Sequence, residues 1–251
     1  MPGPGLRVPR SHLASATAAG LALLAAAAPA LAQAPSFSEV TGREFGDRIT
    51  HHHEMVRYLE ALAEGTPRVT LVDQGESWEG RRLLAAVVTS PQNHARLEEI
   101  RRVASQPAAP RGTGPAGIEE LVADQPVVVW YGGSIHGNEL SGSEGLLKLL
   151  ERLATADDAA TRRVLENAVV IIDPMLNPDG REAFARVNRE NLGRSPNPDL
   201  LDWNNDFTSW EGYKYRTGHY YFDTNRDWFA HTQRETRARV ATLRDWHPQV
   251  S

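Results

Sequence analysis

Short runs of apolar and β-branched residues predict four strands. Each run is rich in Val, Ile or Leu and is bounded by Gly, Pro or charged residues, which is typical of strands in a buried sheet. The predicted strands are 69–73, 83–89, 126–131 and 168–173. Residues 75–80 form a turn-rich connection, so we expect the first two strands to pair antiparallel.

Apolar residues that recur three or four positions apart predict amphipathic helices around these strands. The predicted helices are 47–63, 93–103, 117–123, 141–155 and 232–246. The helix at 141–155 lies between two apolar strands, and such a strand–helix–strand unit is right-handed with parallel strands. The pattern therefore predicts one α/β domain with a mixed, mostly parallel central sheet flanked by helices. A further strand is expected to begin at Val250.

Two segments lack helical or strand periodicity. Residues 106–115 are rich in Pro and Gly and predict a loop within an insertion before the third strand. Residues 181–221 are polar and rich in Asn, Asp, Gly and aromatic residues. A loop of this length in a compact domain is usually functional, so we expect it to form one wall of a cleft.

The N-terminus has the pattern of a secretory signal peptide. Arg7 and Arg10 supply positive charge, a short apolar run follows at 21–28, and A-x-A cleavage sequences come after it. The apolar run is short for a membrane span. We therefore expect a signal peptide at 1–34, a single domain at 35–251 without a membrane span, and export to the periplasm or the exterior.

The composition of the chain excludes some kinds of site and gives no support for some kinds of partner. The chain has 251 residues, a net charge of −5 and no cysteine. Without cysteine, the chain has no disulfides, no thiolate catalysis and no Cys-ligated zinc. The mild negative charge gives no reason to expect nucleic acid or a membrane surface as a partner.

A histidine and a glutamate follow the third predicted strand. His136 and Glu139 come after the small residues at 132–134, at the end of a strand where open α/β sheets place their chemistry. One turn can bring an imidazole and a carboxylate at this spacing onto one Zn²⁺, leaving positions for a third protein ligand and a water. Taken alone, the same pattern also fits a hydrogen-bonded surface turn.

Two further motifs change the interpretation. Asn177-Pro-Asp-Gly180 follows the fourth predicted strand, and Asn225-Arg226 lies further along the chain. Together with His136-x-x-Glu139, these motifs and their order resemble the zinc metallocarboxypeptidase family, the carboxypeptidase A-like or M14 peptidases, over roughly residues 50–251. The resemblance implies a carboxypeptidase-like fold and a Zn²⁺-dependent enzyme that hydrolyses C-terminal residues from peptides; with the signal peptide, this enzyme is expected to be exported.

The resemblance also implies a role for individual residues. His136 and Glu139 would be the first two zinc ligands, and Asp223 would orient the imidazole of His136. Asn225 and Arg226 would bind the free C-terminal carboxylate of a peptide or peptide-like substrate. The planar fork of arginine suits that role because it grips a carboxylate in bidentate fashion.

One more arginine is implied between the two later motifs, where the family uses it to polarise the scissile carbonyl. Arg216 is the first candidate for this catalytic role, and Arg189 is the second. The Asn177-Pro-Asp-Gly180 motif is expected to be a rigid turn that shapes the floor of the cleft.

The family's third zinc ligand, a histidine, and its general base, a glutamate, lie well beyond the Asn-Arg pair. We therefore expect the chain to be the N-terminal part of such a domain, truncated before the C-terminal strands. Alone, it is expected to bind zinc weakly and to be inactive. The alternative third ligands within the chain are His219, His231 and His247.

Two other functions remain open on these residues. The first keeps the metal site and changes the substrate, giving a zinc-dependent deacylase or a cell-wall peptide amidase. The second is a non-catalytic binding protein built on the same fold. The loop at 181–221 would set the choice of substrate, and its sequence does not identify one.

Overall fold

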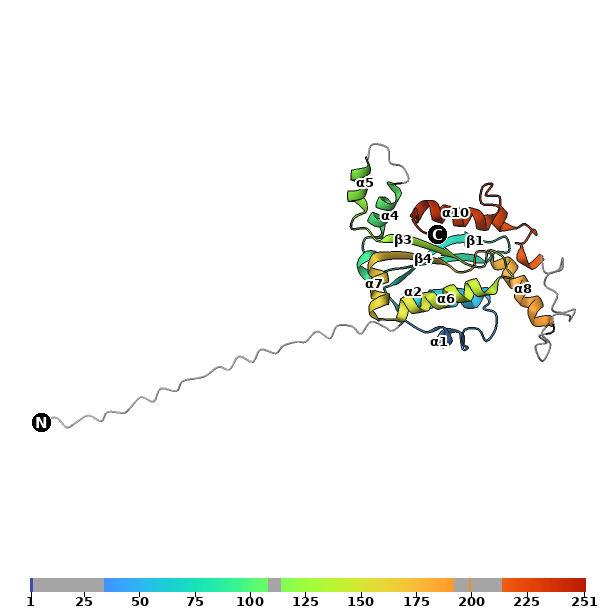
Figure 1. Ribbon diagram of the computed structural model, residues 1–251. Coiled ribbons are helices and arrows are strands. Elements are labelled where there is room, and N and C mark those ends of the chain that lie inside the picture. Colours follow the sequence, from blue (N-terminus) through green and yellow to red (C-terminus); the bar gives the residue numbers. More distant parts are fainter. Residues whose placement is uncertain (2–33, 108–113, 192–198, 200–213) are drawn as a thin grey trace. The chain divides into compact units, whose positions relative to one another are not determined.

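The structure is a computed structural model that describes residue 1 and residues 34–107, 114–191, 199 and 214–251 (Figure 1). The chain divides into two units, Met1–Leu31 and Ala32–Ser251, and the second contains every described helix and strand. The signal peptide predicted at 1–34 lies almost entirely outside the described residues, so its prediction stays a prediction.

A mixed sheet forms the core of the second unit. Its described strands are β1 (Val69–Glu76), β2 (Arg82–Val88), β3 (Val127–Gly132) and β4 (Ala168–Asp173), in the order β1-β2-β4-β3. β1 pairs antiparallel with β2, β2 pairs antiparallel with β4, and β3 pairs parallel with β4. Every residue of β4 is buried, which agrees with its place inside the sheet and with its apolar sequence.

The prediction of a mixed sheet flanked by helices is confirmed, but the described strands are less parallel than expected. Among them, only the β3–β4 ladder is parallel. β2 belongs to a hairpin with β1 and is not part of the strand–helix–strand unit, so it enters the sheet antiparallel to β4. On its other edge, β3 forms a parallel bridge between Val129 and Val250, where the sequence predicted that a strand begins.

Helices surround the sheet in the described part of the chain. They are α1 (Phe37–Thr41), α2 (His52–Gly65), α3 (Pro91–His94), α4 (Leu97–Ser105), α5 (Pro115–Val122), α6 (Leu140–Thr155), α7 (Ala159–Asn167), α8 (Pro178–Asn191) and α10 (Arg234–Trp246), with a short 3-10 helix η2 at Thr224–Arg226. The sequence predicted α6 and α10 closely and missed α7. None of the described helices has the length and apolar character needed to span a membrane.

These helices cover both faces of the sheet (Figure 1). On one face, Leu59 of α2 and Leu147 of α6 pack with Ile172 of β4 in one apolar cluster. On the other face, Trp246 of α10 packs in a second cluster with Ile171 of β4. Successive strand residues point to opposite faces, so neighbouring isoleucines join different clusters and β4 anchors both layers.

The predicted loop over 181–221 is wrong at its start, because Pro178–Asn191 forms the helix α8. The sequence is polar, but after the buried residues 178–180 the next buried residues of α8 share one helical face: Arg181, Phe184 and Ala185. Because arginine counts as a polar residue, a buried arginine interrupts the apolar periodicity that would otherwise indicate a helix. Most of the remaining loop lies outside the described residues.

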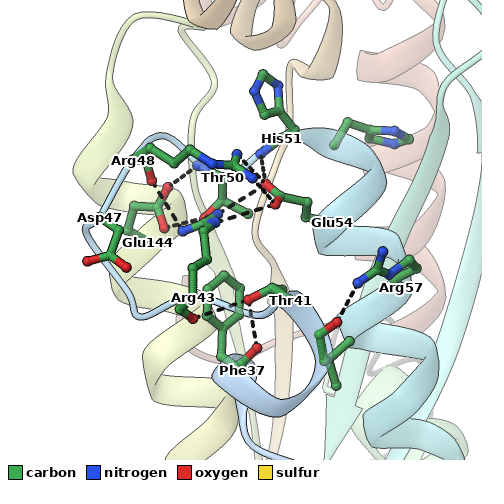
Figure 2. A network of polar contacts seen from close by, with 12 residues as sticks. Phe37, Thr41, Arg43, Asp47, Arg48, Thr50, His51, Glu54, Arg57 and Glu144 are labelled. Carbon is green, nitrogen blue, oxygen red and sulfur yellow. Dashed lines mark hydrogen bonds and ion pairs between the residues drawn. The ribbon is translucent and has the colours of Figure 1, made fainter.

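The helix predicted at 47–63 begins only at His52, because an ion-pair cluster occupies the residues before it (Figure 2). Glu54 pairs with Arg43 at 3.1 Å and with Arg48 at 2.6 Å. Burial alone would raise the pKa of Glu54, but these arginines and a backbone N–H lower that pKa to about 2. The charges therefore define where α2 starts.

Candidate active site

Three loops meet beyond the C-terminal ends of β3 and β4. A Cβ on Gly137 would lie 2.1 Å from the backbone carbon of Gly180 and 2.3 Å from the carbonyl oxygen of Tyr215. A Cβ on Gly180 would lie 2.3 Å from the carbonyl oxygen of Thr217. Only glycine fits such close backbone approaches. These two glycines therefore allow motifs that are far apart in the sequence to touch.

Asn177 links these loops by hydrogen bonds. Its Oδ1 accepts from the Gly180 N–H at 2.9 Å, and its Nδ2 donates to the carbonyl oxygen of Arg216 at 3.3 Å. The Gly137 N–H donates to the same carbonyl oxygen at 3.2 Å. The motif predicted as a rigid turn is thus the start of α8, where Pro178 fits because first-turn N–H groups have no helical partner.

His136 is 3% exposed, and its two ring nitrogens face two different carboxylates. Nδ1 lies 2.8 Å from Oε1 of Glu139, and Nε2 lies 3.1 Å from Oδ1 of Asp223. The Glu139 N–H donates to the His136 carbonyl oxygen at 3.1 Å, so a single turn brings the two side chains together. The Glu139 side chain is 53% exposed, so this side of the imidazole opens to solvent.

Both ring nitrogens of His136 face a carboxylate oxygen. An imidazole nitrogen can donate a proton to a carboxylate or, when it carries the lone pair, bind a cation together with it. The half-exposed Nδ1–Glu139 side is the one that opens to solvent, and the Nε2–Asp223 side is the more buried.

Asp223 is held in place by η2. Its Oδ1 accepts a hydrogen bond from the Asn225 N–H at 2.9 Å and caps this short helix. The hydroxyl of Thr224 donates to the carbonyl oxygen of Ile135 at 3.1 Å, directly beside His136. The segment that carries Asp223 is therefore fastened to the loop that carries the imidazole.

Arg216 also lies at this site. Its Nη1 is 3.0 Å from Oε1 of Glu139, and its Nε is 3.7 Å from Oδ2 of Asp223. The other candidate, Arg189, is exposed on α8 and makes no contact with His136, Glu139 or Asp223 among the described residues. Of the two arginines that the sequence proposed, the structure brings only Arg216 to the site.

Asn225 and Arg226 lie on η2, directly after Asp223; Asn225 is half-buried and Arg226 is exposed. The Arg226 guanidinium donates to the carbonyl oxygen of Asn225 at 3.2 Å in an exposed position. It forms no ion pair with any described residue. Asp227, a sequence neighbour, instead caps the start of the following segment by accepting from the Gln233 N–H at 2.8 Å. Among the described residues, no acidic side chain competes with an anionic ligand for the guanidinium of Arg226.

Two residues that the sequence patterns did not predict, Trp228 and Arg239, support this segment. Trp228 donates from Nε1 to Oδ1 of Asn225 at 3.0 Å, and the buried guanidinium of Arg239 lies 4.1 Å from the centre of the Trp228 ring. Trp228 adjoins the Asn225-Arg226 motif, and this proximity could have indicated its role. Arg239 gave no such signal, because a helical arginine is usually exposed.

Asp173, at the end of β4, lies near Arg239. Burial raises the pKa of Asp173 to about 6, although Gln74 and Arg239 partly oppose the shift.

The three other histidines considered as ligands lie elsewhere. His219 contacts Glu79 at 3.0 Å, His231 contacts the carbonyl oxygen of Trp228 at 2.7 Å, and His247 ends α10 in a left-handed conformation. No group of three or more His, Asp or Glu side chains in the described residues is arranged to hold a metal ion. Two predicted ligands meet at the site, and a third is not among the residues described.

The sequence of the chain matches a known protein family. The family model for zinc carboxypeptidases, peptidase family M14, matches residues 55–251. Because this range is most of the chain, the chain belongs to the zinc carboxypeptidase family. The resemblance inferred from the three motifs is confirmed.

Individual relatives are more distant. Carboxypeptidase D of Anas platyrhynchos is 27% identical over 201 residues, covering 78% of this chain and 11% of that protein. Carboxypeptidase 2 of Trichophyton rubrum is 38% identical over 73 residues, covering 29% of this chain and 13% of that protein. The chain thus spans only a small part of the length of these curated relatives.

Among solved structures, a metallo-carboxypeptidase from Burkholderia cenocepacia is similar to this chain with a TM-score of 0.44 and 20% identity. The match covers 76% of this chain and 37% of that structure.

Proposed function

We propose that this chain carries part of the active site of an exported, Zn²⁺-dependent metallocarboxypeptidase that removes C-terminal residues from peptides. The observation that carries the proposal is the orientation of His136, whose Nε2 is held by Asp223 while Nδ1 lies beside Glu139. Membership of the zinc carboxypeptidase family supports a hydrolase. The metal, the substrate and the export of this chain belong to the proposal.

The donor set fits zinc. Imidazole nitrogen and carboxylate oxygen are both ordinary zinc ligands, and a catalytic zinc has three protein ligands and an open position. His136 and Glu139 would hold the ion, which when bound supplies a Lewis acid that polarises a carbonyl and acidifies water. We propose that the third protein ligand lies outside the described residues.

Arg216 would stabilise the oxygen on which negative charge develops during hydrolysis. Its backbone carbonyl oxygen accepts two hydrogen bonds, from Asn177 and Gly137, so contacts with both of these segments fix its position. The side chain is 29% exposed and reaches Glu139. A fixed guanidinium at such a position stabilises an oxyanion without reorganisation in the transition state.

Asn225 and Arg226 would bind the free carboxylate of the substrate. The Arg226 side chain is exposed and has no ion-pair partner among the described residues, and arginine binds carboxylates in a bidentate fashion. Trp228 occupies the Asn225 Oδ1, which leaves the amide Nδ2 as a donor toward a ligand. Binding of the C-terminal carboxylate of the substrate would restrict cleavage to the last peptide bond of the substrate.

Paired peptides test the proposal in the mature full-length protein loaded with Zn²⁺. The peptides share one sequence and end either in a free carboxylate or in an amide. We expect Arg226→Ala to weaken hydrolysis of the free peptide by a loss on the order of 1.5–3 kcal/mol in transition-state stabilisation, because a charge-assisted contact is removed.

The matched control is Arg237→Ala, which removes an exposed arginine from α10 and should leave hydrolysis unchanged. Equal losses for Arg226→Ala on the free and amidated peptides would show that Arg226 does not bind the carboxylate. Hydrolysis that survives both a chelator and His136→Ala would overturn the proposed function as a whole.

A further inference from the structure

Arg181 is a fully buried arginine on α8 whose side chain contacts two other segments, α6 and the residue Thr50 that precedes α2. Its side chain is 0% exposed, and its Nη2 pairs with Oε1 of Glu144 on α6 at 2.6 Å. Its Nε donates to the carbonyl oxygen of Thr50 at 3.0 Å, and its Nη1 donates to the carbonyl oxygen of Leu140 at 3.4 Å. One planar guanidinium thus satisfies three acceptors in three directions.

Glu144 completes this arrangement from the other side. Its Oε1 accepts from the Thr50 N–H at 2.8 Å, and its Oε2 accepts from the Thr50 hydroxyl at 2.6 Å (Figure 2). Arg43 also donates to the Thr50 hydroxyl, at 2.9 Å. Burying these charges is favourable only because each has several partners, so the group is held in one geometry.

This geometry bears on the candidate metal ligand. Leu140 directly follows Glu139, and its carbonyl oxygen is one of the three acceptors of Arg181. Glu144 lies one helical turn further along α6. Arg181 therefore contacts both the first residue and the second turn of the helix that begins after Glu139.

The backbone of Arg181 is tied to the second loop of the site. The Arg181 N–H donates to the carbonyl oxygen of Asn177 at 3.1 Å, and Asn177 holds the carbonyl oxygen of Arg216. The backbone of residue 181 thus supports the Arg216 side of the site, while its side chain supports the Glu139 side.

We propose that Arg181 is a positioning residue, which fixes the start of α6 so that the Glu139 carboxylate lies beside Nδ1 of His136. This inference rests on the proposed function, because it concerns the residue assigned there as a zinc ligand. Glu139 itself is half exposed and would otherwise sample many rotamers. Lysine cannot replace Arg181 fully, since an ammonium is a point charge without a planar fork.

Zinc affinity of the metal-free full chain tests this inference without any activity assay. Zn²⁺ is titrated in competition with a chromophoric chelator, and thermal unfolding is followed in parallel. We expect Arg181→Met to lower zinc affinity about tenfold, the size of effect seen when groups that orient metal ligands are removed. Arg181→Lys keeps a charge opposite Glu144 and should lower the affinity less.

Arg43→Met is the matched control. Arg43 is also a buried cation in this cluster, with a side chain 8% exposed, but it pairs with Glu54 and contacts neither Leu140 nor Glu144. We expect both methionine variants to lose thermal stability and only the Arg181 variant to lose zinc affinity. If Arg181 only stabilised the fold, zinc affinity would change to the same extent in Arg181→Met and Arg43→Met.

The outcomes separate the two proposals. Wild-type zinc binding that His136→Ala abolishes, together with unchanged affinity in Arg181→Met and Arg181→Lys, would overturn this inference alone. If Arg181→Met does not fold, an unchanged affinity in Arg181→Lys overturns it. Wild-type zinc binding that is insensitive to His136→Ala would overturn the proposed function, and this inference with it.

Discussion

At His136, each of the two ring nitrogens contacts a different carboxylate, Asp223 at Nε2 and Glu139 at Nδ1. Asp223 is 11% exposed and fixed by η2, whereas Glu139 is half exposed and belongs to the same turn as the histidine. A fixed partner can set the orientation of the ring, and a more exposed partner can share a cation with it. The sequence spacing predicted the contact with Glu139. The contact with Asp223 joins residues 87 positions apart, and only the family resemblance suggested it.

Removing the fixed partner should weaken metal binding without unfolding the domain. We expect Asp223→Ala to lower zinc affinity by about 10- to 100-fold, because the imidazole loses the acceptor that orients it. Competition with a chelator measures this loss. Asp227→Ala is the control, since Asp227 is a buried carboxylate nearby that caps backbone N–H groups and does not touch His136. Similar zinc affinities in the two variants would argue against an orienting role for Asp223.

Elements with an apolar period were predictable, and elements defined by charge were not. The strand at 168–173 was predicted with the boundaries that β4 has, because it is a continuous apolar run. α8 was missed because the inward face of that helix includes Arg181. The start of α2 was displaced because ion pairs around Glu54, and not hydrophobic spacing, determine where the helix begins.

The Glu54 carboxylate near the start of α2 should make the stability of the fold depend on pH. The pKa of Glu54 in the folded chain is about 2, below the ordinary value of about 4.3 for a glutamate. The unfolded chain therefore takes up the proton more readily, so the contribution of Glu54 is complete above about pH 5 and is lost as the pH falls toward 2.

We expect the thermal unfolding midpoint of the wild type to fall more steeply over this pH range than that of Glu54→Gln. Glu60→Gln is the control, because Glu60 is a partly exposed carboxylate on the same helix that pairs with Arg82. Parallel curves for the wild type and Glu54→Gln would show that Glu54 does not contribute to acid sensitivity.

The site as a whole depends on contacts that no local pattern predicts. Gly137 and Gly180 permit three loops to touch, and the carbonyl oxygen of Arg216 accepts hydrogen bonds from two of them. Sequence patterns placed His136 at the end of a strand and the resemblance named its partners. The choice of Arg216 over Arg189 required the fold, because both lie in the same interval of the sequence.

A crystal structure of the chain grown with Zn²⁺, with anomalous diffraction recorded on both sides of the zinc absorption edge, tests the proposed metal centre most directly. We predict one anomalous peak about 2.0–2.2 Å from Nδ1 of His136 and from a carboxylate oxygen of Glu139, with Asp223 still bound to Nε2. A zinc ion bound through Nε2, or one that leaves both His136 and Glu139 without contact, would contradict the account.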